Sequence, residues 1–367
     1  MLVLNYEFPP LGGAAPASFE IAERMAKSEA YDIDVITMDF RGLPNYESVT
    51  PNFRVHRVNC LRSRRDISQP WELAIYLVSG FLKANQLIRK QQYDRVHCHF
   101  IIPTGILGLL IKWRFGLPYV ISAHGSDVPG YNPDRFTLLH TFTRPLLKLI
   151  CHHSERIIAL SHYLKDLIRR KIAHYDDEKL IVIPNGIDAA SYLPLAKEGV
   201  ILSTGRLLPR KGFQSLIAAV SEDDIGYELH IAGDGPMANE LQSISRSSKT
   251  PVIFHGWIDN CSKEYKELLG KASIYCLVSK SENASVALLE AMSAGCAVIT
   301  STAPGCIETV DRSGLTIPYD NVSELRKVLV DLIGSKEKQS DFGQLARERI
   351  LANYQWDPII KEYTKYL

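Results

Sequence analysis

Residues 200–220 read Val-Ile-Leu-Ser-Thr-Gly-Arg-Leu-Leu-Pro-Arg-Lys-Gly-Phe-Gln-Ser-Leu-Ile-Ala-Ala-Val. The run opens with an apolar strand pattern at Val200–Ser203, passes through a glycine-containing turn, and continues as a helical pattern from Lys211 to Val220. A short apolar segment followed by a loop and a helix is one part of a β-α-β unit. The segment therefore predicts a parallel sheet with helices packed on its faces.

The same alternation extends in both directions from this unit. Downstream, strand patterns recur at residues 228–232, 251–254, 273–277, 297–300 and 314–317. Upstream, a separate series lies at residues 2–6, 34–38, 95–98, 119–122, 156–159 and 180–183. Helical patterns fill the gaps at residues 19–27, 70–91, 144–152, 237–247, 284–294 and 356–367. Two such series predict an α/β protein with two Rossmann-like, doubly wound halves.

A boundary between the halves is expected at Pro184-Asn185-Gly186-Ile187-Asp188, where proline and glycine indicate a hinge. The chain has 367 residues, about twice the usual domain size, which agrees with two domains. Open α/β sheets bind ligands at the carboxyl ends of their strands. Two halves facing one another would form a central cleft there, so functional residues are expected in loops that follow strands.

Composition and charge narrow the class of protein. The chain is 46% apolar and 23% charged, which is typical of a soluble globular protein and excludes a disordered or fibrous one. The formal net charge is +1, but residues 1–186 contain 23 Lys and Arg against 18 Asp and Glu. A basic first half favours an anionic acceptor or peripheral association with the inner face of a membrane, and ordinary charge scatter is the alternative. No nucleic-acid partner is expected.

The seven cysteines are odd in number and form no CxxC pair, so neither a disulfide framework nor a zinc cluster is indicated. A reducing cytoplasm is the expected location. The first residues lack the basic and apolar regions of a signal peptide. The most apolar stretch, residues 101–111, is too short to cross a bilayer.

Two loops carry groups suited to an anionic ligand. Gly12 and Gly13 follow the first strand pattern, and glycine lets backbone N–H groups approach a phosphate closely, although a plain tight turn is the alternative. Arg206 and Lys211 share the turn after Val200–Ser203. Arginine supplies a planar fork and lysine a mobile point charge, which suits a diphosphate; a solvated basic loop is the alternative.

The most informative segment is Glu282-Asn-Ala-Ser-Val-Ala-Leu-Leu-Glu290-Ala-Met-Ser-Ala-Gly295. Glu282 follows a strand pattern, whereas Glu290 falls inside the next helix. A carboxylate within that helix would lie beside a bound nucleotide and not across a glycosidic bond, so an acid/base pair of the glycosidase kind is rejected. Glu290 is instead expected to accept hydrogen bonds from ribose hydroxyls, and Glu282 from hydroxyls of a transferred sugar.

The turn before that helix is expected to bind the donor phosphates. Asn283 or Ser285 can cap the helix, and the first backbone N–H groups of a helix have no partner within it. The N–H groups near Val286 and Ala287 are therefore expected to hold phosphate. With Ala284, these residues form a predicted donor-binding turn.

Glu-x7-Glu followed by Ala-Met-Ser-Ala-Gly, with Gly-Arg-x4-Lys-Gly about 75 residues earlier, resembles the family-4 glycosyltransferases of GT-B fold. The resemblance spans nearly the whole chain. It is carried further by Phe8-Pro-Pro-Leu-Gly-Gly13, Ser122-Ala-His124-Gly-Ser-Asp127, Ile183-Pro-Asn-Gly-Ile-Asp188, Ala232-Gly-Asp-Gly-Pro236 and Phe254-His-Gly-Trp-Ile258. It implies an acceptor-binding domain at residues 1–186, a nucleotide-sugar-binding domain at 187–350, and a last helix at 351–367 that crosses back onto the first domain.

The resemblance implies a set of catalytic residues. Arg206 and Lys211 would neutralise the leaving diphosphate, and Glu282 would hold hydroxyls of the transferred sugar. His124 would lie near that sugar. No metal site is implied, and no cofactor beyond the nucleotide diphosphate-sugar donor is required for the chemistry.

The resemblance also implies donor-binding positions. Gly12 and Gly13 would let their loop approach the diphosphate, and Glu290 would bind the ribose. The backbone at Trp257 and Ile258 would meet the base. One departure concerns the sugar pocket: many relatives have glycine and an aromatic residue after the first glutamate, where this chain has Asn283-Ala-Ser.

The implied reaction is transfer with retention, which gives an α-linked product by front-face substitution. A UDP-sugar is the leading donor and GDP-mannose the next, with a glycan or lipid-linked acceptor in polysaccharide or lipopolysaccharide assembly. A nucleotide-sugar 2-epimerase of the same fold and a non-catalytic nucleotide-sugar-binding subunit are the alternatives.

Two polar motifs are interpreted as structural. Asp32-Ile33-Asp34 resembles a metal-binding Asp-x-Asp, but its place at the start of a strand favours ordinary surface placement. In His97-Cys98-His99 the two histidines point to one side of a strand and the cysteine to the other, so a structural or cleft-edge role is favoured over a metal site.

Overall fold

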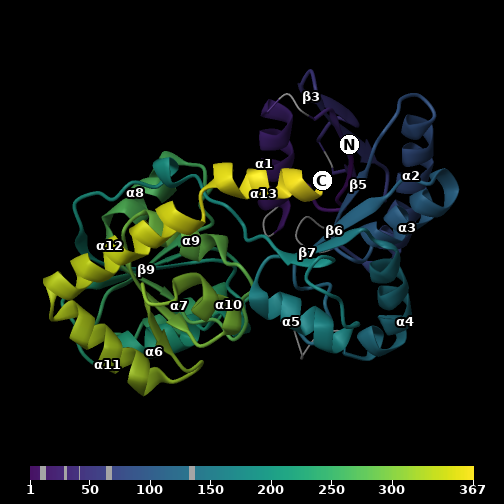
Figure 1. Cartoon of the computed structure of the whole chain (residues 1–367). Helices are drawn as coiled ribbons and strands as arrows, with labels where there is room; N and C mark the ends of the chain where they lie inside the picture. The colour runs from purple at the N-terminus through teal and green to yellow at the C-terminus, as the bar shows by residue number, and fades with distance from the viewer. Residues whose placement is uncertain (9–13, 29–30, 41, 63–67, 132–136) are drawn as a thin grey trace. The chain divides into compact units, whose positions relative to one another are not determined.

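The computed structural model describes residues 1–8, 14–28, 31–40, 42–62, 68–131 and 137–367. The chain divides into two compact units (Figure 1). Unit 1 comprises Met1–Pro184 and Asp357–Leu367, and unit 2 comprises Asn185–Trp356. The chain therefore passes from one unit to the other twice.

Unit 1 contains an eight-stranded sheet in the order β3-β4-β2-β1-β5-β6-β7-β8. Its strands are β1 (Leu2–Leu4), β2 (Ile33–Met38), β3 (Tyr46–Thr50), β4 (Phe53–Val58), β5 (Val96–His99), β6 (Tyr119–Ala123), β7 (Arg156–Ala159) and β8 (Leu180–Val182). Neighbouring strands are parallel except for the antiparallel pair of β3 and β4. The order reverses between β1 and β5, which is the switch point of a doubly wound sheet.

Within the part of unit 1 that the structure describes, six helices accompany this sheet: α1 (Ala14–Lys27), α2 (Pro70–Ile88), α3 (Thr104–Phe115), α4 (Thr137–His153), α5 (His162–Lys171) and α13 (Trp356–Tyr366). β-α-β crossovers are right-handed. A helix therefore covers one face of the sheet where successive strands are added towards one edge, and the other face where they are added towards the opposite edge. In Figure 1, α2, α3 and α4 follow one another along the side of β5, β6 and β7, and α13 lies beside α1. Tyr31 and Arg95 donate to the Thr364 and Tyr366 carbonyls, which attaches α13 to the sheet.

Unit 2 contains a six-stranded sheet, all parallel, in the order β11-β10-β9-β12-β13-β14. Its strands are β9 (Glu198–Thr204), β10 (Glu228–Ala232), β11 (Val252–Gly256), β12 (Ala272–Leu277), β13 (Ala297–Ser301) and β14 (Leu315–Ile317). Its helices are α6 (Phe213–Ser221), α7 (Ala238–Ser245), α8 (Lys263–Lys271), α9 (Val286–Ser293), α10 (Pro304–Val310), α11 (Val322–Ile333) and α12 (Lys336–Asn353), with short 3₁₀ turns at Ala189–Ser191 and Pro209–Lys211. The two doubly wound sheets confirm the predicted fold class.

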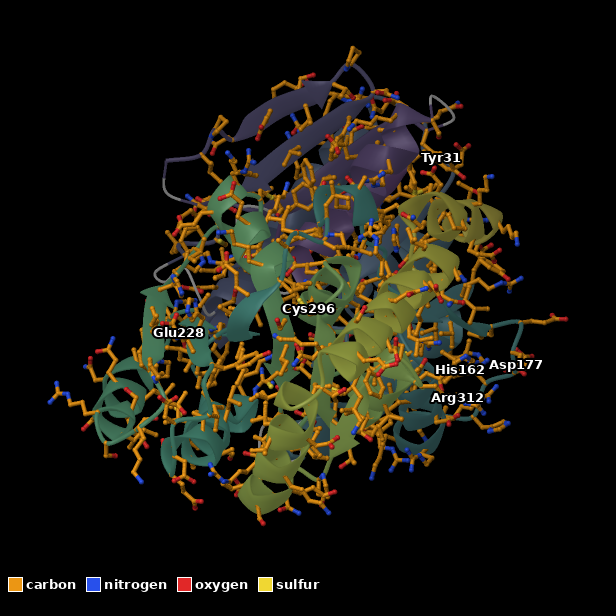
Figure 2. All side chains as sticks on the ribbon, turned by 90° about the vertical axis from the view of Figure 1, so that its left-hand side faces the viewer. Tyr31, His162, Asp177, Glu228, Cys296 and Arg312 are labelled. Carbon is orange, nitrogen blue, oxygen red and sulfur yellow. The ribbon has the colours of Figure 1, made fainter. Side chains whose placement is uncertain are left out.

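Each unit has its own hydrophobic core, built where the two faces of a sheet meet the surrounding helices. In unit 2, one cluster around Leu202 and Tyr275 lies between the sheet and α9, and another around Ile201 and Phe213 lies on the opposite face. Figure 2 shows Cys296 within unit 2, whereas Glu228 lies at its surface. The strands carry almost continuous apolar runs because parallel sheets are covered on both faces.

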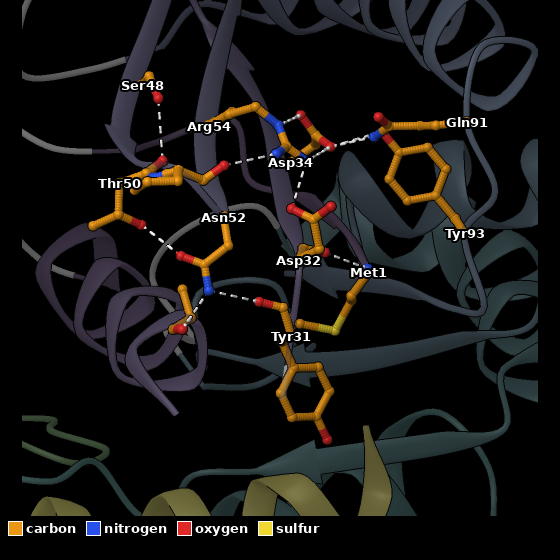
Figure 3. Close-up of polar contacts among 12 residues, drawn as sticks. Met1, Tyr31, Asp32, Asp34, Ser48, Thr50, Asn52, Arg54, Gln91 and Tyr93 are labelled. Carbon is orange, nitrogen blue, oxygen red and sulfur yellow. Dashed lines mark hydrogen bonds and ion pairs between the residues drawn. The ribbon is translucent and has the colours of Figure 1, made fainter. Parts of the chain in front are cut away.

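The hairpin of β3 and β4 was not predicted, because its polar positions obscure the strand pattern. Asp34 of β2 is 1% exposed, so its interpretation as an ordinary surface residue is wrong. Arg54 donates to both of its carboxylate oxygens at 2.9 and 2.8 Å (Figure 3). His56 lies 2.7 Å from one of these oxygens. Tyr93 donates at 2.9 Å. His56 is therefore a buried polar residue of β4 and Arg54 a half-buried one, and both pair with the carboxylate of the neighbouring strand.

Candidate functional site

The carboxyl edge of the unit 2 sheet brings together most of the residues predicted from the sequence. β9 and β12 are neighbours, and the chain winds outward from them in opposite directions. Loops that follow two such strands diverge and leave a crevice, which is where doubly wound sheets bind ligands. The loop after β9 spans residues 205–212, and the loop after β12 spans residues 278–285.

These two loops are held against each other through their backbones. The Lys280 N–H donates to the Arg210 carbonyl at 2.7 Å. A Cβ on Gly212 would lie 2.3 Å from the Val278 carbonyl oxygen, and Gly212 has a φ of +75°. Only glycine fits such a contact with this backbone angle. Gly212 therefore ends the short turn that carries Lys211 and sets its distance from the second loop.

Lys211 and Glu282 meet across this junction. The Lys211 ammonium donates to the Glu282 carboxylate, and the two side chains are 16% and 11% exposed. A charge pair shielded from water interacts more strongly than one at the open surface. The pair therefore fixes the orientation of both side chains while leaving them within reach of a ligand.

Arg206 lies on the same loop with its side chain exposed. The backbone around it is fixed by the turn after β10, where the Leu207 N–H donates to the Asp234 carbonyl at 2.9 Å. A Cβ on Gly233 would lie 1.9 Å from the Gly205 carbonyl oxygen, and one on Gly235 would lie 2.6 Å from that of Leu207. The Gly-Asp-Gly motif after β10 is thus explained as a close backbone contact that supports the Arg206 loop.

The turn that precedes α9 is held from two sides. The Asn185 side chain donates to the Ala284 carbonyl at 3.3 Å. A Cβ on Gly305, at the start of α10, would lie 2.0 Å from the Asn283 carbonyl oxygen. Ser285 occupies the N-cap position of α9, but its side chain makes no capping hydrogen bond. The first turn of α9, at Val286 and Ala287, therefore has no side-chain cap from Ser285.

Glu290 lies one helical turn deeper in α9 and is 2% exposed. One carboxylate oxygen accepts from the Tyr192 hydroxyl and the Asn260 amide, each at 3.2 Å, and the other from the Tyr265 hydroxyl at 2.6 Å. Burial raises the pKa of Glu290, and the hydrogen bonds from Tyr265, Asn260 and Tyr192 oppose that rise. The carboxylate is consequently an oriented acceptor within the core of unit 2.

Sequence reasoning missed these three partners of Glu290. Tyr192 follows the boundary segment, Asn260 follows β11, and Tyr265 lies in α8, so no sequence spacing relates them to one another. The Tyr265 hydroxyl also lies 3.3 Å from the Thr204 hydroxyl, which in turn lies 2.8 Å from the Tyr275 hydroxyl. A buried polar chain therefore connects Glu290 to the end of β9, directly before Gly205 and Arg206.

Trp257 and Ile258 follow β11 at the same edge of the sheet. Trp257 is 73% exposed, whereas Ile258 is half-buried and packs against the cluster that contains Leu289. An exposed indole beside a fixed backbone segment is available for stacking on a planar ligand. Asn260 lies two residues further on, so one loop contributes both Trp257 and a partner of Glu290.

His124 lies in unit 1, in the loop after β6, whereas the other predicted catalytic residues lie in unit 2. Its Nε2 is 3.1 Å from Nδ1 of His99, the last residue of β5. The His97 and His99 rings lie 4.2 Å apart, which confirms that they share one side of the strand. Burial lowers the pKa of His124 to about 3. The imidazole is therefore neutral near pH 7.

The backbone of the His124 loop is organised by Asp127. Its carboxylate accepts from the N–H groups of His124 at 3.1 Å, Gly125 at 3.0 Å and Ile101 at 2.7 Å. This ties the loop after β6 to the loop after β5. The predicted donor-binding residues Gly12 and Gly13 lie outside the described residues.

In the part of the chain that the structure covers, no group of three or more histidine, cysteine, aspartate and glutamate side chains has the geometry to hold a metal ion. None of the described helices combines the length and the apolar character that a membrane span requires.

Two family models match the chain in succession. The model described as Glycosyltransferase Family 4 matches residues 11–191, and the model described as Glycosyl transferases group 1 matches residues 188–349. A curated relative, an uncharacterized glycosyltransferase of Methanocaldococcus jannaschii, is 23% identical over 98% of this chain and 95% of its own length.

Solved structures share the architecture. Sucrose-phosphate synthase from Thermosynechococcus elongatus superimposes with a TM-score of 0.85 at 19% identity, over 100% of this chain and 97% of that one. Anabaena HepE in complex with UDP-glucose superimposes with a TM-score of 0.77 at 18% identity, over 100% of this chain and 99% of that one. The two doubly wound units are those of a GT-B fold.

Proposed function

This chain belongs to glycosyltransferase family 4, and on that premise we propose that it transfers a hexose or an N-acetylhexosamine to a glycan or lipid-linked acceptor. The family consists of retaining enzymes that use nucleotide-sugar donors, so the proposed product carries an α-glycosidic bond. A UDP-sugar is the favoured donor and GDP-mannose the next. The similarity to HepE, which was solved with UDP-glucose, supports this order.

The observation that carries the proposal is the meeting of Lys211 with Glu282 beside the N-terminus of α9. As the bond from the anomeric carbon to the diphosphate breaks, negative charge develops on the leaving group. Donors that are already oriented towards such charge are usually the largest catalytic contribution. Arg206, Lys211 and the N–H groups of the first turn of α9 supply a cationic fork, an ammonium and a helix dipole.

The pairing of Lys211 with Glu282 has a role in this proposal before the donor binds. The carboxylate keeps the ammonium at the edge of the sheet and prevents it from adopting other rotamers. When the diphosphate arrives, the ammonium is shared with phosphate oxygens, and Glu282 accepts hydroxyls of the donor sugar. His124 is neutral at physiological pH and so hydrogen-bonds to the sugar without adding charge.

Glu290 binds the ribose in this proposal. Three donors already occupy its carboxylate, and a carboxylate offers about four acceptor positions. Ribose therefore takes the remaining position and displaces the partner that is most easily moved. Asn260 is that partner, because it is exposed whereas Tyr192 and Tyr265 are buried.

A screen of nucleotides by thermal unfolding tests the donor. At equal concentration, the nucleotide that binds most tightly stabilises the folded chain most, and a ligand at about 100 times its Kd stabilises it by about 2.7 kcal/mol. UDP is therefore expected to raise the unfolding midpoint more than GDP or ADP. A larger shift with GDP would reassign the donor to GDP-mannose. Equal shifts with all three would contradict a base-selective site.

Product analysis with the selected donor tests the reaction. The proposal expects nucleoside diphosphate to be released in equal amount to an α-linked glycoside of the acceptor. Conversion of the donor into its 2-epimer, with no glycoside formed, would identify the alternative epimerase activity and overturn the proposal.

A further inference from the structure

Three histidines of unit 1 lie together at the ends of two neighbouring strands. Because side chains alternate along a strand, His97 and His99 of β5 point to the same side of the sheet. The register of the sheet pairs His99 with Ser122 of β6, and His124 follows two residues later. His97 and His99 are buried, whereas His124 is half-buried. Of the three histidines, only His124 has a role in the proposed function.

The backbone and the ring of His99 are held from several directions. The His99 carbonyl accepts from the Thr104 hydroxyl at 2.5 Å. The His97 ring lies 4.2 Å from the His99 ring, and His97 Nε2 is itself 2.8 Å from the Ser122 hydroxyl. His99 is 0% exposed. Its imidazole is therefore fixed within the core of unit 1.

The next residue, Phe100, contacts the His124 ring as well. Its φ is +81°, a backbone angle that a residue with a side chain keeps only where the surrounding structure holds it. The Phe100 ring lies 4.5 Å from the His124 ring and 4.9 Å from the Tyr6 ring. The consecutive residues His99 and Phe100 therefore both fix the position of the His124 imidazole.

A hydrogen bond joins the imidazoles of His99 and His124, whose Nδ1 and Nε2 atoms are 3.1 Å apart. Burial lowers the pKa of both side chains, that of His124 to about 3, so both rings are neutral near pH 7. A neutral imidazole has one nitrogen that donates and one that accepts. One of the two nitrogens that meet therefore carries a proton, and its position decides the tautomer of both rings.

The other ring nitrogen of His99 favours one of the two arrangements. Among the described residues, His99 Nε2 is buried and has no hydrogen-bond partner. If His124 donated, His99 would carry its proton on this nitrogen, and a buried N–H group would have no acceptor. Buried N–H groups without an acceptor are rarer in folded proteins than acceptors without a donor. The arrangement in which His99 donates from Nδ1 avoids such a group, and it leaves the proton of His124 on Nδ1.

We propose that His99 is a positioning residue that holds His124 in the tautomer with its proton on Nδ1. The inference rests on the proposed function, in which His124 hydrogen-bonds to the transferred sugar. His124 then donates from Nδ1 to a hydroxyl oxygen of that sugar, while its Nε2 accepts from His99. A free histidine prefers the proton on Nε2, so the hydrogen bond from His99 reverses the intrinsic preference. The partner of one ring nitrogen commonly sets the state of the other in this way.

Nitrogen NMR of the full chain with isotope-labelled histidine measures the tautomer without any substrate. The protonated and unprotonated nitrogens of a neutral imidazole have well-separated chemical shifts, and the signals lost in His124→Gln identify His124. The wild-type chain is expected to show the proton of His124 on Nδ1. His99→Leu removes the donor and is expected to shift His124 towards the tautomer with the proton on Nε2. His99→Asn is expected to keep the wild-type tautomer, because the asparagine N–H can take the place of Nδ1–H.

Steady-state kinetics measure the consequence for the reaction. His99→Leu is expected to lower kcat/KM by about 2- to 10-fold, the range for the loss of one hydrogen bond between neutral groups. His99→Asn is expected to restore most of this loss. The affinity for UDP is expected to stay unchanged in both variants, since UDP carries no sugar for His124 to bind. Retained ring signals of His97 establish that β5 is folded in each variant.

A matched control is another imidazole pair, in unit 2, where His230 Nδ1 lies 3.0 Å from His255 Nε2. His230→Leu removes one member of that pair and is expected to change neither the tautomer of His124 nor kcat/KM.

The proposal is overturned if His124 of the wild-type chain carries its proton on Nε2, or if His99→Leu leaves the tautomer unchanged. It is also overturned if the tautomer changes but kcat/KM of His99→Leu equals that of the control. If the tautomer changes as expected but the wild-type chain transfers no sugar from any donor, the proposed function is wrong and the role of His99 in setting the tautomer is still supported.

Discussion

Asp34 of unit 1 and Glu282 of unit 2 are both carboxylates near the ends of parallel strands, but they face opposite edges of their sheets. Asp34 is the second residue of β2 and lies at the amino edge, where it has four side-chain partners. Glu282 follows β12 at the carboxyl edge, where it is paired with Lys211. Asp34, at the amino edge of its sheet, thus has all its acceptor positions filled by protein groups, whereas Glu282, at the carboxyl edge of its sheet, lies where a ligand can reach it.

The electrostatics of the two sites differ for the same reason. Burial opposes ionisation of Asp34, but hydrogen bonds from Arg54, His56 and Tyr93 outweigh it and lower its pKa. All its acceptor capacity is used within the protein. At the carboxyl edge of the unit 2 sheet, the cations and the helix N–H groups are held in position and can still bind a ligand. We expect substitutions at the first site to reduce stability and those at the second to reduce turnover.

The largest expected effect on stability is that of Asp34→Asn. Removing the buried charge of this network leaves Arg54 with only the exposed Asp32 as a counter-ion, and breaking a buried ion pair typically costs about 3–5 kcal/mol. The free energy of unfolding, measured by urea denaturation, is expected to fall by this amount. Asp32→Asn is the matched control, because Asp32 also contacts Arg54 but its side chain is 67% exposed, and such pairs contribute about 1 kcal/mol or less. Equal effects of the two substitutions would contradict the comparison.

The same network predicts a pH dependence. The folded pKa of Asp34 lies below its unfolded value of about 3.9, so its stabilising contribution is complete above about pH 4 and is lost as the pH falls below that value. Stability of the wild-type chain is therefore expected to decrease with acid more steeply than that of Asp34→Asn. Identical slopes below pH 4 would show that Asp34 is not the group responsible.

At the second site, Lys211→Ala and Arg206→Ala are each expected to reduce turnover by about 10²–10³-fold, because each removes one donor directed at the leaving diphosphate. Steady-state kinetics with the donor selected by the nucleotide screen measures this. Arg210→Ala removes a cation from the same loop outside the proposed machinery and is expected to change turnover little. A loss of equal size in Arg210→Ala would indicate general loop damage or non-specific charge.

Tyr265→Phe is expected to have a smaller effect, through Glu290. The substitution removes the 2.6 Å hydrogen bond to the carboxylate, and hydrogen bonds to charged groups contribute about 1.5–3 kcal/mol. Burial already raises the pKa of Glu290, and losing this donor raises it further. As the pH is lowered, Glu290 is therefore expected to be protonated, and nucleotide affinity to be lost, at a higher pH in the variant than in the wild type. If calorimetry shows that nucleotide affinity falls at the same pH in the variant and in the wild type, Glu290 does not bind the ribose.

The smallest expected effect is that of Asn185→Ala. Its amide supports the turn before α9 through a single 3.3 Å hydrogen bond to the Ala284 carbonyl. Such a bond contributes about 0.5–1.5 kcal/mol. The Michaelis constant for the donor is expected to rise several-fold with turnover nearly unchanged. A large loss of turnover with unaltered donor binding would give Asn185 a different role.

The sequence predicted elements whose side chains alternate or repeat in a regular way. The strands Arg156–Ala159 and Glu228–Ala232 coincide with their apolar runs. The hairpin of β3 and β4 was missed because the polar residues Arg54 and His56 of β4 pair with Asp34 on another strand. A local pattern contains no information about such a partner.

The same limit applies to the site. Lys211 and Glu282 were predicted because each lies in a loop after a strand, and parallel strands bring such loops to one edge. The partners of Glu290 come from three separate segments, and only the packed structure unites them. Gly233 and Gly305 were not assigned a role, because the only sign in the sequence of a close backbone contact between distant loops is the glycine itself.

The central claim is that Arg206, Lys211 and the first turn of α9 bind the diphosphate of the donor. Calorimetric titration of UDP and UMP tests it most directly, because the two ligands differ only in the β-phosphate. The wild-type chain is expected to bind UDP more tightly than UMP, and Lys211→Ala and Arg206→Ala are each expected to reduce that difference while leaving the affinity for UMP nearly unchanged. An undiminished preference for UDP in both variants would contradict the account.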